Sequence, residues 1–147
     1  MTVRAAQQSD GERWRELFAA YREFYKLPQD EVVVRRVWDW VNDARHETHS
    51  LVATVDDAVV GIANYRRFAR PSTGSTGLWL DDLFTDPAVR GCGAGRALIS
   101  RLQRIAAAEG LSVVRWITAA DNEVAQQLYD RLATQTSWVT YDATPNA

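Results

Sequence analysis

The chain has 147 residues, 46% hydrophobic and 24% charged, so it can build one domain around a single core and is too apolar to be disordered. Its formal charge of −2 provides no basic excess for binding nucleic acid or anionic lipid. No apolar run approaches the roughly 20 residues of a membrane helix, and one cysteine with two histidines disfavours a disulfide or a metal site. We therefore predict a single cytoplasmic domain over residues 1–147 that holds no metal.

The first third of the chain predicts two helices. Ser9 and Glu12 match an S-x-x-E capping box, and apolar residues then recur at helical spacing until Pro28. A second helical face follows over Val34–Val41. Before both helices, Thr2–Ala5 is a plausible short strand.

The middle of the chain predicts strands. Leu51–Val55 and Ala58–Tyr65 flank an Asp-Asp pair that suits a hairpin turn, because short acidic side chains tolerate left-handed backbone. Pro71–Gly77 has the composition of a flexible loop. Leu78–Thr85 then predicts a buried strand that ends at an Asp-Pro turn.

The last third alternates helices and strands. Ala94–Glu109 is predicted as a helix that stops at Gly110. Val113–Thr118 follows as a strand, Glu123–Leu132 as a helix with apolar residues at i, i+4 and i+8, and Trp138–Tyr141 as a final strand.

The segment Arg90–Arg96 reads R-G-C-G-A-G-R and lies between a predicted strand and a predicted helix. Amides beside three glycines at a helix start can converge on an anion, which predicts a diphosphate site; the alternative is a turn built only for tight packing. A Walker loop is excluded because Arg96 stands where lysine is required, and a Rossmann fingerprint is excluded because the loop lacks G-x-G-x-x-G.

Two patterns resemble the GNAT superfamily of acetyl-CoA-dependent N-acetyltransferases. One is R-x-x-G-x-G over Arg90–Gly95, preceded by the strand and Asp-Pro turn of Leu80–Pro87. The other is Asn122, seven residues before Tyr129 on the next predicted helix. Within the superfamily the chain is most similar to the fungal histone and polyamine acetyltransferases, then to the spermidine/spermine acetyltransferases, over nearly its whole length.

The resemblance implies an α/β fold in which a mixed, mostly antiparallel central sheet is flanked by helices on both faces. It also implies acetyl-CoA as co-substrate, with the pantetheine arm paired to residues 83–85 like an added strand. A β-bulge there would supply an amide to the thioester carbonyl. The residues assigned to coenzyme A in this way are Leu83, Phe84, Thr85, Arg90, Gly91, Cys92, Gly93, Ala94, Gly95, Arg96 and Asn122.

Catalysis requires a proton acceptor, because an alkyl amine with a pKa near 10.4 is protonated at neutral pH. Asp81 and Asp82 point to opposite faces of a regular strand, so only one faces the substrate, and Asp81 holds the position of the acidic residue in the polyamine enzymes. Tyr129 is similarly placed to protonate the departing thiolate. The resulting hypothesis is direct acetyl transfer to a small primary amine in a ternary complex. A coenzyme-A-binding regulatory module and a protein-lysine acetyltransferase remain alternatives.

Substrate charge and assembly are also addressed by the sequence. The arginines at positions 66, 67 and 70 favour an acceptor that carries a carboxylate, such as an amino acid, although alternation prevents Arg66 and Arg67 from facing one pocket. A rival acidic set, which would favour a polyamine, consists of Asp39, Asp43 and Glu47. The apolar segment Trp138–Tyr141 predicts a homodimer, because an exposed edge of that kind invites pairing.

Overall fold

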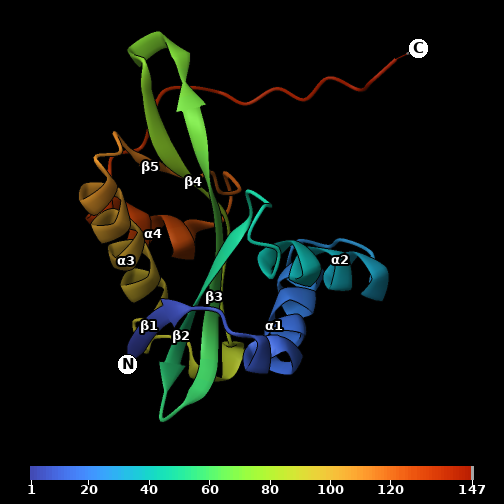
Figure 1. Cartoon of the computed structure of the whole chain (residues 1–147). Coiled ribbons are helices and arrows are strands. Elements are labelled where there is room, and N and C mark those ends of the chain that lie inside the picture. Colours follow the sequence, from blue (N-terminus) through green and yellow to red (C-terminus); the bar gives the residue numbers. More distant parts are fainter. Residues whose placement is uncertain (147) are drawn as a thin grey trace. The chain divides into compact units, whose positions relative to one another are not determined.

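The structure is a computed structural model that describes residues 1–146. Its contacts divide the chain into two compact units, Met1–Ile117 and a second unit that begins at Thr118. The first unit contains a five-stranded sheet and three of the α-helices, and the second contains one α-helix and the C-terminal segment (Figure 1). Each unit is described by itself.

The sheet has the strands in chain order across its width, β1-β2-β3-β4-β5. The first four strands pair antiparallel, and only β4 and β5 pair parallel, so the predicted mixed, mostly antiparallel sheet is confirmed. The long β3–β4 hairpin forms its centre. The strands are β1 (Thr2–Ala5), β2 (His49–Val55), β3 (Ala58–Arg70), β4 (Ser75–Thr85) and β5 (Val114–Arg115).

The helices fall close to their predicted positions, and α3 and α4 have the predicted bounds. The capping-box prediction at Ser9 is wrong, because α1 begins at Gly11 with Asp10 as its N-cap residue. Asp30 is the N-cap residue of α2, because its carboxylate accepts hydrogen bonds from the Val32 and Val33 amides at 3.0 and 3.3 Å. The helices are α1 (Gly11–Phe24), α2 (Glu31–Val41), α3 (Ala94–Glu109) and α4 (Glu123–Leu132).

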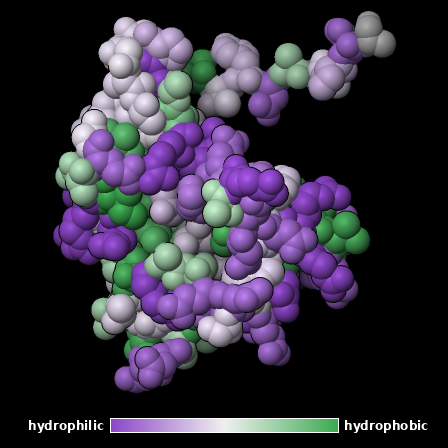
Figure 2. All heavy atoms as spheres, in the orientation of Figure 1, coloured by the Kyte–Doolittle hydropathy of each residue, from purple (hydrophilic) through white to green (hydrophobic). Residues whose placement is uncertain are grey.

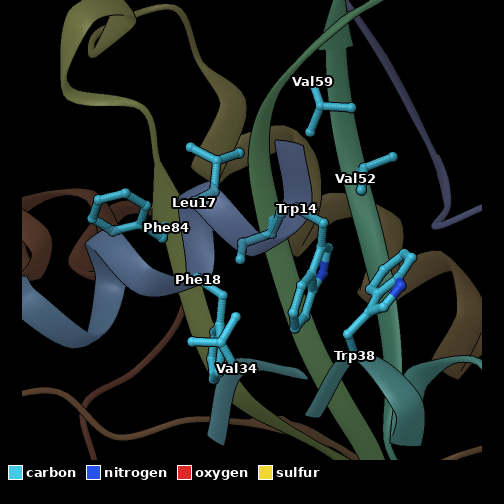
Figure 3. Close-up of a cluster of buried hydrophobic side chains, with 9 residues drawn as sticks. Trp14, Leu17, Phe18, Val34, Trp38, Val52, Val59 and Phe84 are labelled. Atoms are coloured by element: carbon cyan, nitrogen blue, oxygen red, sulfur yellow. The ribbon is translucent and has the colours of Figure 1, made fainter. Parts of the chain in front are cut away.

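Helices cover both faces of the sheet, as predicted. Ile62 of β3 is fully buried in a cluster with α1 and α2 side chains, whereas an atom added at Gly61 would meet α3 at 3.4 Å. Neighbouring residues of a strand point to opposite faces, so α1 and α3 pack on opposite sides of β3. Figure 3 shows the core on the α1 side, where Trp14 packs against Phe18 and Trp38 with ring centroids 5.0 Å apart.

Three predicted segments differ from the structure. Of the strand predicted at Val113–Thr118, only Val114–Arg115 forms β5. Pro71–Gly77 is not an open loop. Pro71–Thr73 form a 3-10 turn, and β4 begins at Ser75 as the second strand of the β3–β4 hairpin. Trp138–Tyr141 is not a strand, because the chain after α4 has no regular element within the described residues. The Trp138 side chain is 84% exposed there. A strand at the end of a chain needs a neighbour to pair with, and aromatic content alone does not supply one.

The outer surface over α1 and α2 is mostly hydrophilic (Figure 2). Within residues 1–146, none of the helices has both the length and the apolar content needed to cross a bilayer.

Candidate active site

A β-bulge shapes the centre of the β3–β4 hairpin. Asn64 of β3 pairs with Asp82, but the next residue, Tyr65, pairs with Leu80, so Asp81 is an extra residue in β4. A bulge interrupts the strict alternation of side chains along a strand. The prediction that Asp81 and Asp82 face opposite sides is therefore wrong, because both carboxylates line the same hollow.

This hollow, which we call the bulge hollow, has a volume of about 360 Å³ and opens between α2, the segment before β2, and the bulge. The charged residues that line it are Asp81, Asp82, Glu47 and Arg66. Its apolar lining is formed by Phe18, Val37 and Trp40. The Trp40 ring stacks on His46, another lining residue, with centroids 4.7 Å apart.

Asp82 lies beside two neutral polar side chains. The Asn64 side-chain amide donates to its carboxylate at 3.0 Å, and the Tyr21 hydroxyl of α1 lies near the same carboxylate and lowers its pKa. Asn64 is 1% exposed, and its Oδ1 atom has no hydrogen-bond partner in residues 1–146. A buried amide oxygen in that state is uncommon, because an unmet hydrogen bond costs about 1–3 kcal/mol.

Asp81 has a charged partner instead. The Arg66 Nε group donates to both carboxylate oxygens of Asp81 at 3.2 and 3.3 Å. The Arg66 guanidinium also lies over the Trp79 ring, 5.7 Å from its centroid. Both members of the ion pair are about one-third exposed, at 34% and 31%, so water screens their attraction.

Burial dominates the acid–base properties of these groups. It raises the pKa of Asp82 above that of an ordinary carboxyl, against the opposing hydrogen bonds from Asn64 and Tyr21. It also raises the pKa of Asp81, against the attraction of Arg66. The pKa of Tyr21 is raised by burial and by the charge of Asp82, so this hydroxyl keeps its proton and acts as a donor.

The arginines that the sequence grouped together are separated by the structure. Arg66 faces the bulge hollow, whereas Arg67 forms an ion pair with Glu109 of α3 at 2.5 Å on the opposite face. Arg70 donates to Ser112 at 2.7 Å. The predicted alternation of Arg66 and Arg67 is thus confirmed, and only Arg66 reaches the hollow.

The rival acidic set is divided as well. Glu47 lines the bulge hollow, but Asp39 and Asp43 do not. The Asp43 carboxylate accepts the Arg45 amide at 2.9 Å, which lowers the pKa of Asp43.

The glycine loop lies between β4 and α3. Gly91 and Gly93 have φ of 85° and 87°, a left-handed conformation that favours glycine, and an atom added at either would point into open space. Gly93 is the N-cap residue of α3 and provides no side-chain cap. The first amides of α3, from Ala94 to Arg96, therefore have neither a side-chain cap nor an intrahelical acceptor. The uncapped amides, the positive end of the helix dipole and the open space beside the glycines together suit a bound diphosphate.

The other predicted coenzyme residues have these positions. Leu83, Phe84 and Thr85 pair with β3 on one edge, while the β4–β5 ladder on the other edge comprises Leu78 and Trp79. Of the loop side chains, Cys92 is exposed and Arg90 lies over the Phe24 ring at 5.5 Å.

Two predicted residues belong to the second unit. Asn122 is the N-cap of α4, and its Oδ1 accepts the Ala125 amide at 3.3 Å. This contact gives Asn122 a structural role in starting the helix. Tyr129 lies within α4 and is partly buried.

Comparison with known proteins identifies the family. The Acetyltransferase (GNAT) family matches residues 12–133. A relative named D-amino-acid N-acetyltransferase HPA3, from Saccharomyces cerevisiae, is 27% identical over 143 residues, covering 96% of this chain and 89% of the relative. An uncharacterized N-acetyltransferase, YhfO of Bacillus subtilis, is 29% identical over 136 residues, or 89% of this chain and 87% of YhfO.

A solved structure supports the same fold. The aminoglycoside N-acetyltransferase AAC(6')-Iy, determined in complex with CoA, superposes with a TM-score of 0.83 at 19% identity and covers 97% of this chain and 93% of that one. The chain belongs to the GNAT family of acetyltransferases. The predicted family and fold are thereby confirmed.

Three further residues were not predicted as site residues: Trp40 and Asn64 line the hollow, and Tyr21 lies near Asp82. Tyr21 counted only as part of an apolar helix face, and Trp40 was not singled out. Asn64 carried a usable signal, because an amide side chain near the end of the apolar strand Ala58–Tyr65 needs a hydrogen-bond partner if it is buried.

Proposed function

We propose that the protein transfers acetyl from acetyl-CoA to a small primary amine that binds in the bulge hollow. The observation that carries the proposal is the pair of carboxylates, Asp81 and Asp82, brought into one hollow by the bulge. Their charge attracts an ammonium group, and their raised pKa values suit them to accept its proton. The fungal histone and polyamine acetyltransferases are the group to which we assign the chain.

The coenzyme is assigned to the glycine loop and the adjoining strand end. The amides of residues 91–96 would bind the pyrophosphate. Those of Ala94–Arg96 have no side-chain cap, whereas the Cys92 amide donates to the Val89 carbonyl at 3.3 Å. The backbone of Leu83 and Thr85 would pair with the pantetheine arm on the edge of β4 beyond the β5 ladder. When bound, acetyl-CoA supplies the acetyl thioester on which the amine acts.

The hollow suits an acceptor with three features. The carboxylates attract the ammonium group, and Arg66 offers a guanidinium to a substrate carboxylate. The apolar lining residues Phe18, Val37 and Trp40 can contact a hydrocarbon side chain. An α-amino acid with an apolar side chain satisfies all three, and the name of the yeast relative agrees with an amino-acid acceptor.

Two residues are proposed for proton transfer. Either Asp81 or Asp82 takes the proton from the ammonium group, which exposes the nitrogen lone pair. Tyr129, by its resemblance to the family pattern, donates a proton to the departing thiolate. Transfer is direct, without an acetylated Cys92, because the amine itself is the nucleophile.

The deciding experiment is a thiol-release assay with acetyl-CoA and a panel of acceptors. The panel should contain D- and L-amino acids, the corresponding decarboxylated amines, spermidine, aminoglycosides and a lysine peptide. We expect amino acids with apolar side chains to give the highest kcat/KM. Efficient acetylation of spermidine without any amino acid would favour the polyamine assignment, and preference for the peptide would favour the protein-lysine alternative. Coenzyme binding without turnover on any amine would favour a regulatory module.

A further inference from the structure

We propose that Asp82, rather than Asp81, is the catalytic residue that accepts the ammonium proton, and that Tyr21 and Asn64 are positioning residues that let Asp82 change its protonation state. This inference rests on the proposed acetyl transfer and assigns a role within it. It is carried by the difference between the hydrogen-bond partners of the two aspartates.

Asp81 is held by a partner that serves only its ionised form. The Arg66 guanidinium has hydrogen-bond donors and no acceptor, and its Nε group donates to both oxygens of Asp81. A proton on Asp81 would cancel the ion pair and leave Arg66 without its anion. The geometry therefore keeps Asp81 ionised as a fixed companion of Arg66.

Asp82 is held by partners that serve both of its forms. The Tyr21 hydroxyl lies near the carboxylate, and a hydroxyl can donate to a carboxylate or accept from a carboxylic acid. The Asn64 amide presents Nδ2 to the carboxylate at 3.0 Å, and half a turn of the amide would present Oδ1 to the acid. The Oδ1 atom of Asn64 has no hydrogen bond in residues 1–146, so rotating the amide breaks no hydrogen bond to Oδ1. The orphaned oxygen is thereby explained as the acceptor for protonated Asp82.

The surrounding packing fixes this arrangement. The Tyr21 ring lies against Phe18, Tyr25 and Phe84, with centroids 5.9, 4.9 and 6.2 Å away, so its hydroxyl has little freedom to leave Asp82. Asn64 is directly opposite Asp82 in the β3–β4 ladder. The other ionisable groups facing the hollow are Asp81, Arg66, Glu47 and His46.

The proton balance is complete without an additional reactant. One N–H bond of the ammonium breaks, its electrons stay on nitrogen, and an O–H bond forms on Asp82. The nitrogen then forms the C–N bond to the acetyl carbon as the C–S bond breaks. As the amide forms, the nitrogen loses a second proton. The released thiolate gains one proton, so the balance closes. Asp82 returns its proton to water before the next turnover.

The test is the pH dependence of kcat/KM for the full chain, measured with the best acceptor amine and with a second amine of different pKa. In the wild type we expect an acidic limb that does not move between the amines, because it belongs to the enzyme. Asp82→Asn should lower kcat by about 100- to 10,000-fold and remove this limb. Asp82→Glu should restore part of the activity together with the limb.

Tyr21→Phe removes one hydrogen bond that favours ionised Asp82 while keeping the ring. It should move the acidic limb to higher pH, a shift that a purely structural role would not produce. Asp81→Asn is the matched variant of the neighbouring carboxylate, and it should retain the limb. Coenzyme affinity measured by calorimetry establishes that each variant is folded.

The outcomes separate the two proposals. If Asp81→Asn removes the limb while Asp82→Asn keeps it, or if Tyr21→Phe leaves the limb in place, the assignment of Asp82 is overturned and acetyl transfer stands. If the wild type acetylates no amine, the proposed function itself is wrong, and the role of Asp82 falls with it.

Discussion

The glycine loop at residues 90–96 and the bulge hollow offer a ligand opposite kinds of surface. The loop offers backbone amides and open space, with Gly91 and Gly93 in the left-handed conformation. The hollow offers charged and aromatic side chains gathered from α1, α2, β3 and β4. A main-chain site recognises a feature common to many ligands, such as a diphosphate, whereas a side-chain site can be changed one residue at a time. The loop therefore suits a common coenzyme, and the hollow suits the particular acceptor.

The largest effect is expected from breaking the loop. Gly93→Val should abolish measurable acetyl-CoA binding, at least a hundredfold loss in affinity, because a branched side chain disfavours φ of 87° and would intrude on the amides. Gly74→Val is a matched control, since Gly74 also has a positive φ of 60° and open space but lies in the β3–β4 turn. Calorimetry that finds unchanged coenzyme affinity in folded Gly93→Val would contradict the loop assignment.

A catalytic effect is expected from the second unit. Tyr129→Phe should lower kcat by about ten- to a thousandfold with little change in coenzyme affinity, because it removes a proton donor and keeps the ring. Thiol-release kinetics over a range of pH provide the measurement. Unchanged turnover at every pH would remove Tyr129 from the mechanism.

The side-chain site should be tunable at one position. Arg66→Ala should raise KM for an amino acid by about ten- to a hundredfold, because it removes a hydrogen-bonded ion pair with the substrate carboxylate. The effect on KM for the decarboxylated amine should be smaller. Arg67→Ala is the control, because Arg67 faces α3 and pairs with Glu109. Equal effects of Arg66→Ala on both substrates would show that Arg66 does not bind the carboxylate.

A buried ionic cluster outside both sites should affect stability alone. Asp10 is 7% exposed and accepts hydrogen bonds from Arg4 at 2.7 and 3.0 Å and from the Gln7 amide at 2.7 Å. The bond from Arg4 is the main reason that the pKa of Asp10 is lowered. This stabilisation is therefore complete above the ordinary carboxyl pKa and is lost as pH falls through the lowered value.

Asp10→Asn should accordingly reduce the free energy of unfolding by about 2 kcal/mol at neutral pH. Urea denaturation of both proteins should show this difference shrinking in acid. A difference that stays constant down to pH 2 would mean that the ion pair is not its source, and a loss of kcat at saturating substrate would link Asp10 to the chemistry.

The smallest effect on chemistry is expected from self-association. We predict a homodimer through the C-terminal segment, where Trp138, Val139 and Tyr141 are 84%, 74% and 88% exposed. Light scattering at micromolar concentration should give twice the chain mass, and a chain ending at residue 137 should give a monomer. A monomer mass for the full chain would refute the prediction.

The sequence by itself predicted the four helices, most of the strands and the position of the glycine loop. These features depend on local signals: helical periodicity in Ala94–Glu109, the turn preference of Asp56-Asp57, and glycines where a left-handed backbone is needed. Such signals act over a few residues, so they can be interpreted without knowing what packs against them. The family resemblance rested on the same local segments.

Only the tertiary structure decided the composition of the hollow. The bulge that turns Asp81 and Asp82 to one side depends on the register between β3 and β4, which no local pattern near Asp81 specifies. The partners of Asp82 come from positions 61 and 18 residues away, at Tyr21 and Asn64. Tyr21 reaches it only because α1 packs on that face of the sheet. Contacts between distant residues are set by packing. A prediction that assumed a regular strand therefore placed Asp81 and Asp82 on opposite faces, although the fold brings them into one hollow.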